Sequence, residues 1–269
     1  MAAEVKDKQR ISNLALRSIS GLIGIPALIA VAWYGNPLLV PVVAVASVIA
    51  TWEFLRLAKH DGAYAPIFFA LYAPLFAICA WQDASPGFEI AGALILPLVW
   101  LIFKRSGNAF HSWAWTSLGL LYAAWLPAHA ILLRNENDGK GWLFIAVFAT
   151  FAVDIAAYLG GRAFGRHKLA PTISPGKTME GTVFGFIGGV LAAWIISIPF
   201  DFLPVGEALV AGAVIGVVSQ LGDLAESMIK RSVGVKDTGV IIPGHGGILD
   251  RLDSLVFSIP VVYYFFTQG

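Results

Sequence analysis

The chain has 269 residues, of which 58% are hydrophobic and only 13% are charged, and its mean hydropathy is +0.75. This composition is typical of a polytopic membrane protein and argues against a soluble helical domain, whose core does not need so many long apolar segments. The formal net charge of +1 says little, because the distribution of charge matters more than its sum. We expect no nucleic-acid partner.

Apolar segments long enough to cross a bilayer recur along the chain. A membrane-spanning helix needs about 20 mostly apolar residues, whereas a β-barrel would show the alternating segments of about ten residues that are missing here. We therefore predict an all-α, polytopic membrane helix bundle with about nine transmembrane helices. In chain order, the predicted spans are residues 14–34, 37–58, 64–82, 88–103, 112–133, 141–160, 180–199, 205–229 and 250–267.

No internal repeat, low-complexity tract or long linker divides the sequence. We predict a single membrane domain over residues 1–269. Within it, the spans of residues 14–133 are expected to serve mainly as scaffold, and residues 141–269 to form the catalytic portion.

Basic residues are distributed unevenly between the predicted spans. If the N-terminus is cytoplasmic, sixteen of the eighteen Lys and Arg residues lie on the cytoplasmic side, and only Arg134 and Lys140 lie on the other. The positive-inside rule then predicts a multi-pass protein of a bacterial-type inner membrane, with its active site facing the cytoplasm. Nine spans place the C-terminal Gly269 on the opposite side.

The eighth predicted span carries charged residues on one helical face. Ser219, Asp223, Glu226 and Lys230 are spaced i, i+4, i+7 and i+11. An ionised carboxylate in hydrocarbon costs at least about 2.5 kcal/mol, so these acids are expected to face the bundle interior or a water-filled cavity. A structural ion pair with Lys230 or Arg231 is the alternative interpretation.

The ninth predicted span begins with a second acidic pair, Asp250 and Asp253, at i and i+3. Helix capping explains one acid at a helix N-terminus, but not both together with the pair on the preceding span. Two helices that each present two carboxylates would repel one another unless cations lay between them. Hard oxygen ligands of this kind favour Mg²⁺, which shares its coordination shell with substrate phosphates.

Cationic residues and a glycine turn separate the two acidic pairs. Lysine and arginine supply positive charge for phosphate, and glycine amides can form an anion-binding nest. His245 is expected either to donate to a phosphate or to order its turn. The residues concerned are Lys230, Arg231, Lys236 and Asp237, followed by the turn Pro243–Gly247.

A second polar stretch precedes the seventh predicted span. Its Gly176-Lys177-Thr178 is similar to the end of a nucleotide-binding P-loop, but Pro171 stands where the first glycine should be and no strand precedes it. We therefore reject the P-loop interpretation. Ser174 or Thr178 also suits the N-cap of the following helix.

Two further acids lie inside predicted spans. Asp154 lies near the cytoplasmic end of the sixth span and is expected to line the same cavity. Glu53, in the second span, is expected to pair with Arg56 at i+3, which is a sufficient local explanation for it.

The charged segment resembles the signature of the phosphatidate cytidylyltransferases, the membrane CDP-diacylglycerol synthases. The match covers Ser227–Asp253, SMIKRSVGVKDTGVIIPGHGGILDRLD, without a gap at any specified position. The chain length, the number of spans, the stretch Ser174–Gly181 and the D-x-x-A-Y-x-x-G pattern at Asp154 are also similar to those of the family.

This resemblance implies transfer of a cytidylyl group from CTP to phosphatidate, with Mg²⁺ as cofactor (two cations, or Mn²⁺ as a substitute, are compatible), membrane lipids as partners and a homodimeric assembly. Asp223 and Asp250 are expected to ligate the metal directly, with Glu226 and Asp253 as direct or outer ligands. The expected phosphate-binding residues are Lys177, Lys230, Arg231, Lys236 and Arg251. The remaining expected substrate-binding residues are Asp154, Ser174, Thr178, Asp237, Gly244, His245, Gly246 and Gly247.

Two other classes of protein also place acids among membrane helices. A CDP-alcohol phosphotransferase would show D-G-x-x-A-R, whereas Gly222–Ser227 reads GDLAES and lacks the arginine. An ion-coupled transporter would show repeated halves and broken helices near the midplane, whereas the acids here gather at one end of the bundle. An assay with CTP, phosphatidate and Mg²⁺ separates the three.

Overall fold

A computed structural model describes residues 24–84, 87–104, 108–200, 204–239, 241 and 246–266. These residues are mostly helical, with one small two-stranded sheet, which confirms the expected all-α membrane class. The ends of the chain, on which the predicted orientation depends, lie outside the described residues, as do Gly244 and His245.

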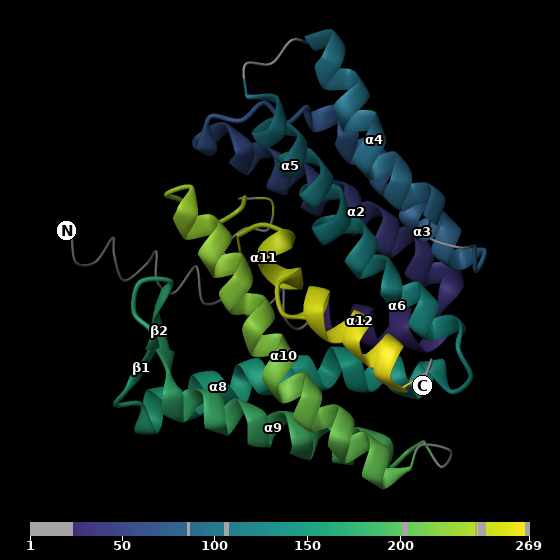
Figure 1. Cartoon of the computed structure of the whole chain (residues 1–269). Helices are drawn as coiled ribbons and strands as arrows, with labels where there is room; N and C mark the ends of the chain where they lie inside the picture. Colours follow the sequence, from purple (N-terminus) through teal and green to yellow (C-terminus); the bar gives the residue numbers. More distant parts are fainter. Residues whose placement is uncertain are drawn as a thin grey trace, which may run out of the picture.

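Figure 1 shows the arrangement of the elements. After a helical segment Gly24–Tyr34 they are α2 (Asn36–Leu57), η1 (Ala58–Asp61), η2 (Ile67–Tyr72), α3 (Ala73–Trp81), α4 (Gly87–Lys104), α5 (Ala109–Leu120), η3 (Leu121–Trp125), α6 (Leu126–Asn135), α7 (Gly139–Phe144), η4 (Ile145–Ala149), α8 (Thr150–Phe164), β1 (Lys168–Ala170), β2 (Ser174–Thr178), α9 (Met179–Ser197), α10 (Val205–Ser232), α11 (Leu249–Leu252) and α12 (Leu255–Phe266).

Six helical stretches of the described chain are long and apolar enough to cross a membrane. They are Asn36–Asp61, Gly87–Lys104, Ala109–Asn135, Gly139–Phe164, Met179–Ser197 and Val205–Ser232. The other three predicted spans coincide with shorter apolar helices, Gly24–Tyr34, Ile67–Trp81 and Leu255–Phe266. The count of about nine spans therefore stays a prediction.

The last predicted span is divided into two helices. α11 ends at Leu252 and α12 begins at Leu255, with a turn at Asp253 and Ser254 between them. At 1.5 Å per residue, α12 is only about 18 Å long, against a hydrocarbon core of about 30 Å. The break places Asp253 at a turn rather than within a continuous helix.

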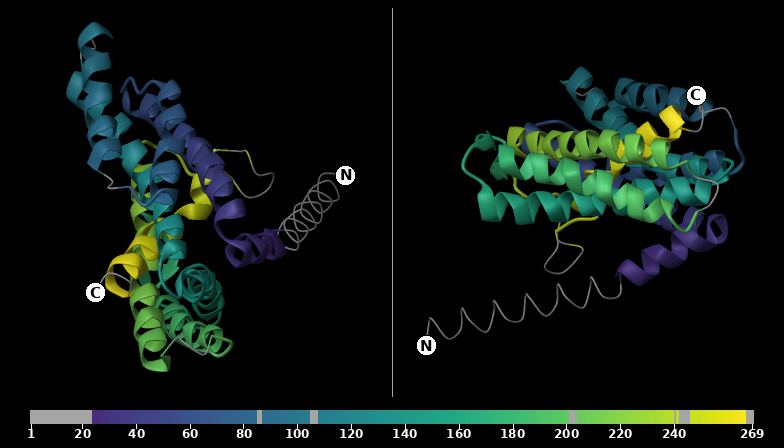
Figure 2. Two further views of the ribbon diagram at one scale, coloured as in Figure 1. Left: turned by 90° about the vertical axis from the view of Figure 1, so that its right-hand side faces the viewer. Right: turned by 90° about the horizontal axis from the view of Figure 1, so that it is seen from below.

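The helices form two groups that share α12. α9 packs against both α8 and α10, and α2 packs against α3 and α6, while α12 contacts both α10 and α6. In both views of Figure 2, the helical segment Gly24–Tyr34 lies at the edge of the bundle. α10 and α12, which carry or adjoin most of the predicted site residues, thus lie where the two groups meet.

Small residues let α9 and α10 approach closely, as is common between membrane helices. A Cβ on Gly189 would lie 3.0 Å from the carbonyl oxygen of Gly212, and one on Gly212 would lie 2.8 Å from that of Gly189. The close contact fixes α10 against α9 near their middle. It thereby sets the distance between the polar start of α9 and the charged end of α10.

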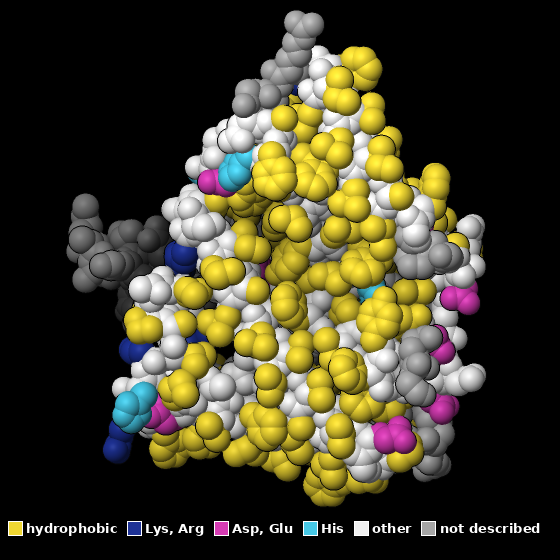
Figure 3. All heavy atoms as spheres, in the orientation of Figure 1, with side chains coloured by type: hydrophobic (Ala, Val, Ile, Leu, Met, Phe, Trp, Pro, Cys, Tyr) yellow, Lys and Arg dark blue, Asp and Glu magenta, His cyan; other side chains and the backbone are white. Residues whose placement is uncertain are grey.

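The outer surface is largely apolar. On the face shown in Figure 3, hydrophobic side chains cover the helices broadly, and Lys and Arg side chains lie at the edge near β1 and β2. Exposed Leu96, Phe103, Val183 and Ile195 belong to this surface. Such an exposed apolar area suits contact with lipid rather than with water.

Candidate active site

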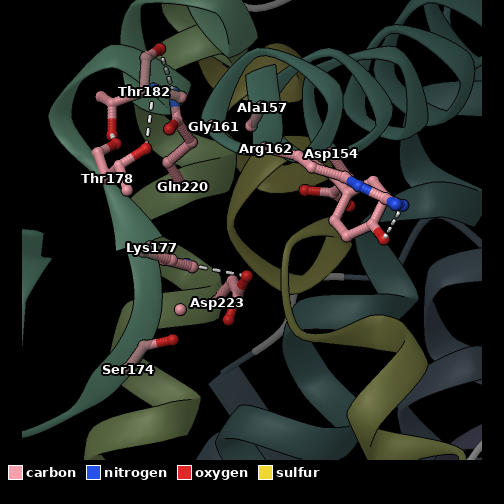
Figure 4. Close-up of a pocket in the computed structure, with 13 residues that line it drawn as sticks. Asp154, Ala157, Gly161, Arg162, Ser174, Lys177, Thr178, Thr182, Gln220 and Asp223 are labelled. Carbon is pink, nitrogen blue, oxygen red and sulfur yellow. Dashed lines mark hydrogen bonds and ion pairs between the residues drawn. The ribbon is translucent and has the colours of Figure 1, made fainter. Parts of the chain in front are cut away.

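A cavity of about 400 Å³ opens where α8, β2, α9 and α10 meet. Five of the predicted site residues, from three different elements, line it: Asp154, Ser174, Lys177, Thr178 and Asp223. Figure 4 shows Lys177 and Asp223 pointing toward one another, with Asp154 across the cavity. The structure therefore brings together residues that are up to 69 positions apart, from Asp154 to Asp223.

The hairpin of β1 and β2 positions the polar stretch. Lys168 pairs with Thr178 and Ala170 with Ser174. The Thr178 hydroxyl accepts a hydrogen bond of 3.1 Å from the amide of Gly181, so it caps the N-terminus of α9 as one of the two sequence interpretations predicts. The cap turns the chain sharply from β2 into α9, which leaves Lys177 at the cavity.

Glu180 secures the other side of the same turn. Its carboxylate accepts hydrogen bonds from the amides of Arg166 and His167, and it lies 2.6 Å from Nδ1 of His167. These contacts join the end of α8 to the start of α9. The hairpin between them is thus anchored at both ends.

Lys177 and Asp223 form an ion pair, with 2.7 Å between Nζ and a carboxylate oxygen. Both side chains are partly exposed to the cavity. A cation and an anion are therefore available to a polar ligand at the same place.

Four cavity residues with polar side chains are missing from the sequence-based set: Tyr158, Arg162, Thr182 and Gln220. Arg162 donates from Nη1 to the hydroxyl of Tyr158 over 3.4 Å. Gln220 donates from Nε2 to the carbonyls of Gly216 and Thr182. Helical spacing could have identified Arg162, because it lies about two turns after Asp154 on α8.

A second charged cluster lies beside the cavity and centres on Lys230. Its ammonium is 2.9 Å from Oε1 of Glu226 and 2.6 Å from Oδ1 of Asp250. The Glu226 side chain is only 1% exposed and the Lys230 side chain 12%. The alternative of a structural ion pair with Lys230 is thus realised for Glu226, while Asp223 pairs with Lys177 instead.

Asp250 is surrounded by donors from its own loop. Oδ2 accepts from the amides of Gly247 and Thr238 over 2.8 and 3.0 Å, and from the Thr238 hydroxyl over 3.0 Å. Gly246 adopts φ +84°, a conformation that glycine reaches without strain. Asp250 is not among the residues that line the cavity, and its oxygens bind the loop and Lys230.

Asp253 lies between the cavity and the Lys230 cluster. A Cβ on Gly222 would lie 2.6 Å from the Asp253 carbonyl oxygen, so α10 and the turn after α11 touch next to Asp223. The charged neighbours of the Asp253 carboxylate are Asp223, Lys230 and Lys177. The two predicted acidic pairs therefore do approach one another, through Asp223 and Asp253.

Arg231, Lys236, Asp237 and Arg251 are not among the residues that line the cavity. Arg231 donates from Nε to the carbonyl of Ile173 and from Nη1 to that of Val235, which connects α10 to the hairpin. Lys236, Asp237 and Arg251 are exposed.

The environment of Glu53 differs from the expected pair with Arg56. Arg56, its predicted partner, instead lies over the ring of Trp52 at 4.6 Å. The Glu53 side chain is fully buried and accepts a hydrogen bond of 2.9 Å from the amide of Leu249. The prediction of a local i, i+3 pair is therefore wrong, because a partner distant in sequence offers a buried donor.

The donor set suits a hard divalent cation. Glu226 Oε2 and the hydroxyl oxygen of Ser219 are buried without a hydrogen-bond partner, and both lie on α10, as Asp223 does. Buried oxygen atoms without donors are expected to bind water or a cation. The described residues contain no group of three or more His, Cys, Asp or Glu side chains arranged to hold a metal by themselves, so a cation here would take further oxygens from substrate or water.

The sequence is similar to known proteins over nearly its whole length. A family model described as Cytidylyltransferase family matches residues 15–268. A phosphatidate cytidylyltransferase of Synechocystis sp. is 34% identical, over 93% of this chain and 95% of that protein. One of Brucella suis is 40% identical over 66% of this chain and 64% of that protein. An Escherichia coli protein named uncharacterized protein YnbB is 44% identical over 65% of this chain, and the match spans 61% of that relative's length.

Proposed function

Because this chain belongs to the cytidylyltransferase family, we propose that it transfers a cytidylyl group from CTP to phosphatidate, giving CDP-diacylglycerol and pyrophosphate. The names of the Synechocystis and Brucella relatives support this pair of substrates. The observation that carries the proposal is the cavity in which Lys177 and Asp223 meet.

The cavity offers what a triphosphate requires. Lys177 is a mobile point charge on a flexible stem, and it can exchange its carboxylate partner for a phosphate oxygen within the same space. Arg162 lines the opposite wall and supplies a planar set of donors. Arg231, Lys236 and Arg251 are exposed, and their positive charge would attract a polyanion.

The reaction places few demands on acid–base groups. A phosphate oxygen of phosphatidate attacks the α-phosphorus of CTP, the bond between that phosphorus and the bridging oxygen to the β-phosphorus breaks, and pyrophosphate leaves with the electron pair. The attacking oxygen is already anionic, so no strong base is required. The barrier arises from repulsion between two polyanions and from charge on the leaving group, and Lys177 and its basic neighbours reduce both.

Asp223 and Asp253, with Glu226 and Asp250 beside them, are the residues we propose to hold Mg²⁺. A bound divalent cation, or a pair of them, would supply charge neutralisation and orientation of the phosphates, and Mn²⁺ would supply the same. Asp250 also fixes its loop and Lys230, so we assign it a role in holding the shape of the site as well as a ligand role.

The lipid substrate is proposed to enter from the side of the bundle. Tyr158 lines the cavity and is 64% exposed, and Leu159 and Val183 beside it are exposed apolar residues. The acyl chains would remain in the bilayer along this surface while the phosphate reaches Lys177. The site is proposed to face the cytoplasm of a bacterial-type inner membrane, in a homodimer.

The test is an assay of purified protein with α-labelled CTP, phosphatidate and Mg²⁺. The expected product is labelled CDP-diacylglycerol, which disappears when EDTA is added and returns with excess Mg²⁺ or Mn²⁺. Release of CMP from CDP-lipid would instead indicate a CDP-alcohol phosphotransferase. The absence of both products would favour a transporter and refute the proposed function.

A further inference from the structure

Glu53 of α2 contacts a loop that lies almost two hundred residues further along the chain. Its Oε2 accepts hydrogen bonds from the amide of Leu249 over 2.9 Å and lies 3.4 Å from the hydroxyl of Thr238. A fully buried acid in a membrane helix is costly, and the Leu249 amide offsets part of that cost at Oε2, while Oε1 is buried without a hydrogen-bond partner.

The contact replaces a cap that α11 lacks. The first amides of a helix have no acceptor within it, and a polar side chain at the N-cap normally provides one. The N-cap of α11 is Ile248, whose side chain has no acceptor atom. Glu53 supplies the acceptor from another part of the chain.

The loop fits closely around the Glu53 side chain. A Cβ on Gly247 would lie 2.4 Å from Oε2, and one on Gly239 would lie 2.4 Å from Oε1. Leu249 packs beside Ala50 and Phe54, residues of α2 that flank Glu53. Apolar packing and hydrogen bonding therefore hold the same turn.

The same loop binds Asp250 on its other side. Gly247 and Thr238 donate backbone hydrogen bonds to Asp250, and the Thr238 hydroxyl lies nearer to Asp250, at 3.0 Å, than to Glu53. Because that hydroxyl has one proton, it donates to Asp250 and leaves the Leu249 amide as the donor of Glu53. Displacement of the loop would therefore displace Asp250, and with it Lys230.

We propose that Glu53 is a positioning residue, which fixes α11 and the Thr238 loop so that Asp250 and Lys230 keep the arrangement that the reaction needs. The inference rests on the proposed function for its kinetic part. It also gives the predicted scaffold half of the chain a direct role in the site, although Glu53 does not line the cavity.

The decisive variant is Glu53→Met, which keeps the side-chain volume and removes the acceptor. Two properties are measured in detergent: kcat for CDP-diacylglycerol synthesis, and deuterium uptake of the peptide that contains Leu249. We expect kcat to fall at least about tenfold while KM for CTP changes less than about threefold, with faster exchange at that peptide. Glu53→Gln keeps one acceptor oxygen. It should therefore show a kcat and a deuterium uptake at the Leu249 peptide close to those of the wild type.

Glu89→Gln is the matched control. Glu89 is also a buried acid of a membrane helix with an unpartnered carboxylate oxygen, but it lies on α4, away from the loop. It should leave exchange at the Leu249 peptide and kcat unchanged. Wild-type exchange and kcat in Glu53→Met, or equal impairment of Glu53→Met and Glu53→Gln, would overturn the proposal.

Two further outcomes are separable. If Glu53→Met yields no folded protein, Glu53→Asp tests the same contact, because its shorter side chain draws the carboxylate away from the Leu249 amide. Faster exchange and lower kcat support the proposal, and wild-type values overturn it. If the wild-type protein makes no CDP-diacylglycerol, the proposed function fails. Deuterium uptake at the Leu249 peptide then still tests whether Glu53 holds the loop.

Discussion

Lys177 of β2 and Asp223 of α10 form an ion pair of 2.7 Å, and it connects the hairpin before α9 to the charged end of α10. Neither side chain is deeply buried, so the pair can open at a modest cost. A ligand with several negative charges would compete for Lys177, and a cation would compete for Asp223. Substrate phosphate would therefore replace Asp223 as the partner of Lys177, and a metal would replace Lys177 as the partner of Asp223.

Replacement of Lys177 by Met should lower the rate of CDP-diacylglycerol synthesis by about 100-fold or more, because the phosphates lose a donor that stabilises charge in the transition state. The labelled-CTP assay measures this effect. Lys140→Met is the control, since the Lys140 ammonium lies 3.8 Å from the ring centroid of Trp33 and not at the cavity. Undiminished synthesis by Lys177→Met would contradict the assigned role.

Replacement of Lys230 by Met should destabilise the protein by about 3–5 kcal/mol, because it leaves two buried acids without their shared cation. Thermal unfolding in detergent measures the loss. Adding Glu226→Gln to the same chain should recover part of the stability but not the activity. An unchanged melting temperature in Lys230→Met would show that the Lys230 cluster does not hold α11 to α10.

Replacement of Thr178 by Ala should cost about 1 kcal/mol of stability, since the hydroxyl caps α9. Thr178→Ser keeps the hydroxyl and should retain stability. If capping is the main role of the side chain, the serine variant will also retain synthesis. A Thr178→Ser variant that is stable but inactive would instead point to a substrate contact that depends on the methyl group.

Replacement of Gly189 by Ala should destabilise the protein by about 1–3 kcal/mol, because the added Cβ would meet Val153 Cγ2 at 2.8 Å and the Gly212 carbonyl oxygen at 3.0 Å. Gly206→Ala is the matched control, with no atom within 4 Å of the added Cβ. It should be neutral or slightly stabilising, as expected for alanine in an open helical position. Equal melting temperatures for the two variants would disprove the close α9–α10 contact.

The sequence predicts the helical membrane fold and much of the site, because charges within apolar segments are conspicuous. Asp154, Lys177 and Asp223 each lie where an apolar run meets a polar stretch, and the structure places all three around one cavity. Helical spacing also identifies Glu226 and Lys230 as neighbours. These inferences depend only on local geometry.

Other features depend on contacts that spacing cannot reveal. Glu53 has a local candidate partner at Arg56, while its actual donor, the amide of Leu249, lies 196 positions away. The turn at Asp253 and Ser254 contains neither Pro nor Gly to indicate it. It is stabilised by tertiary contacts such as the close approach of Gly222.

The hydrogen bond from Leu249 to Glu53 also limits when α2 can reach its final contacts during synthesis of the chain. At about 5–20 residues per second, the ribosome needs roughly 10–40 s to make the 196 residues that separate the two partners. Throughout that interval the nascent chain holds a carboxyl group on α2 without the amide that later binds it. The contact between α2 and α11 can therefore form only after residue 249 has been made, late in synthesis.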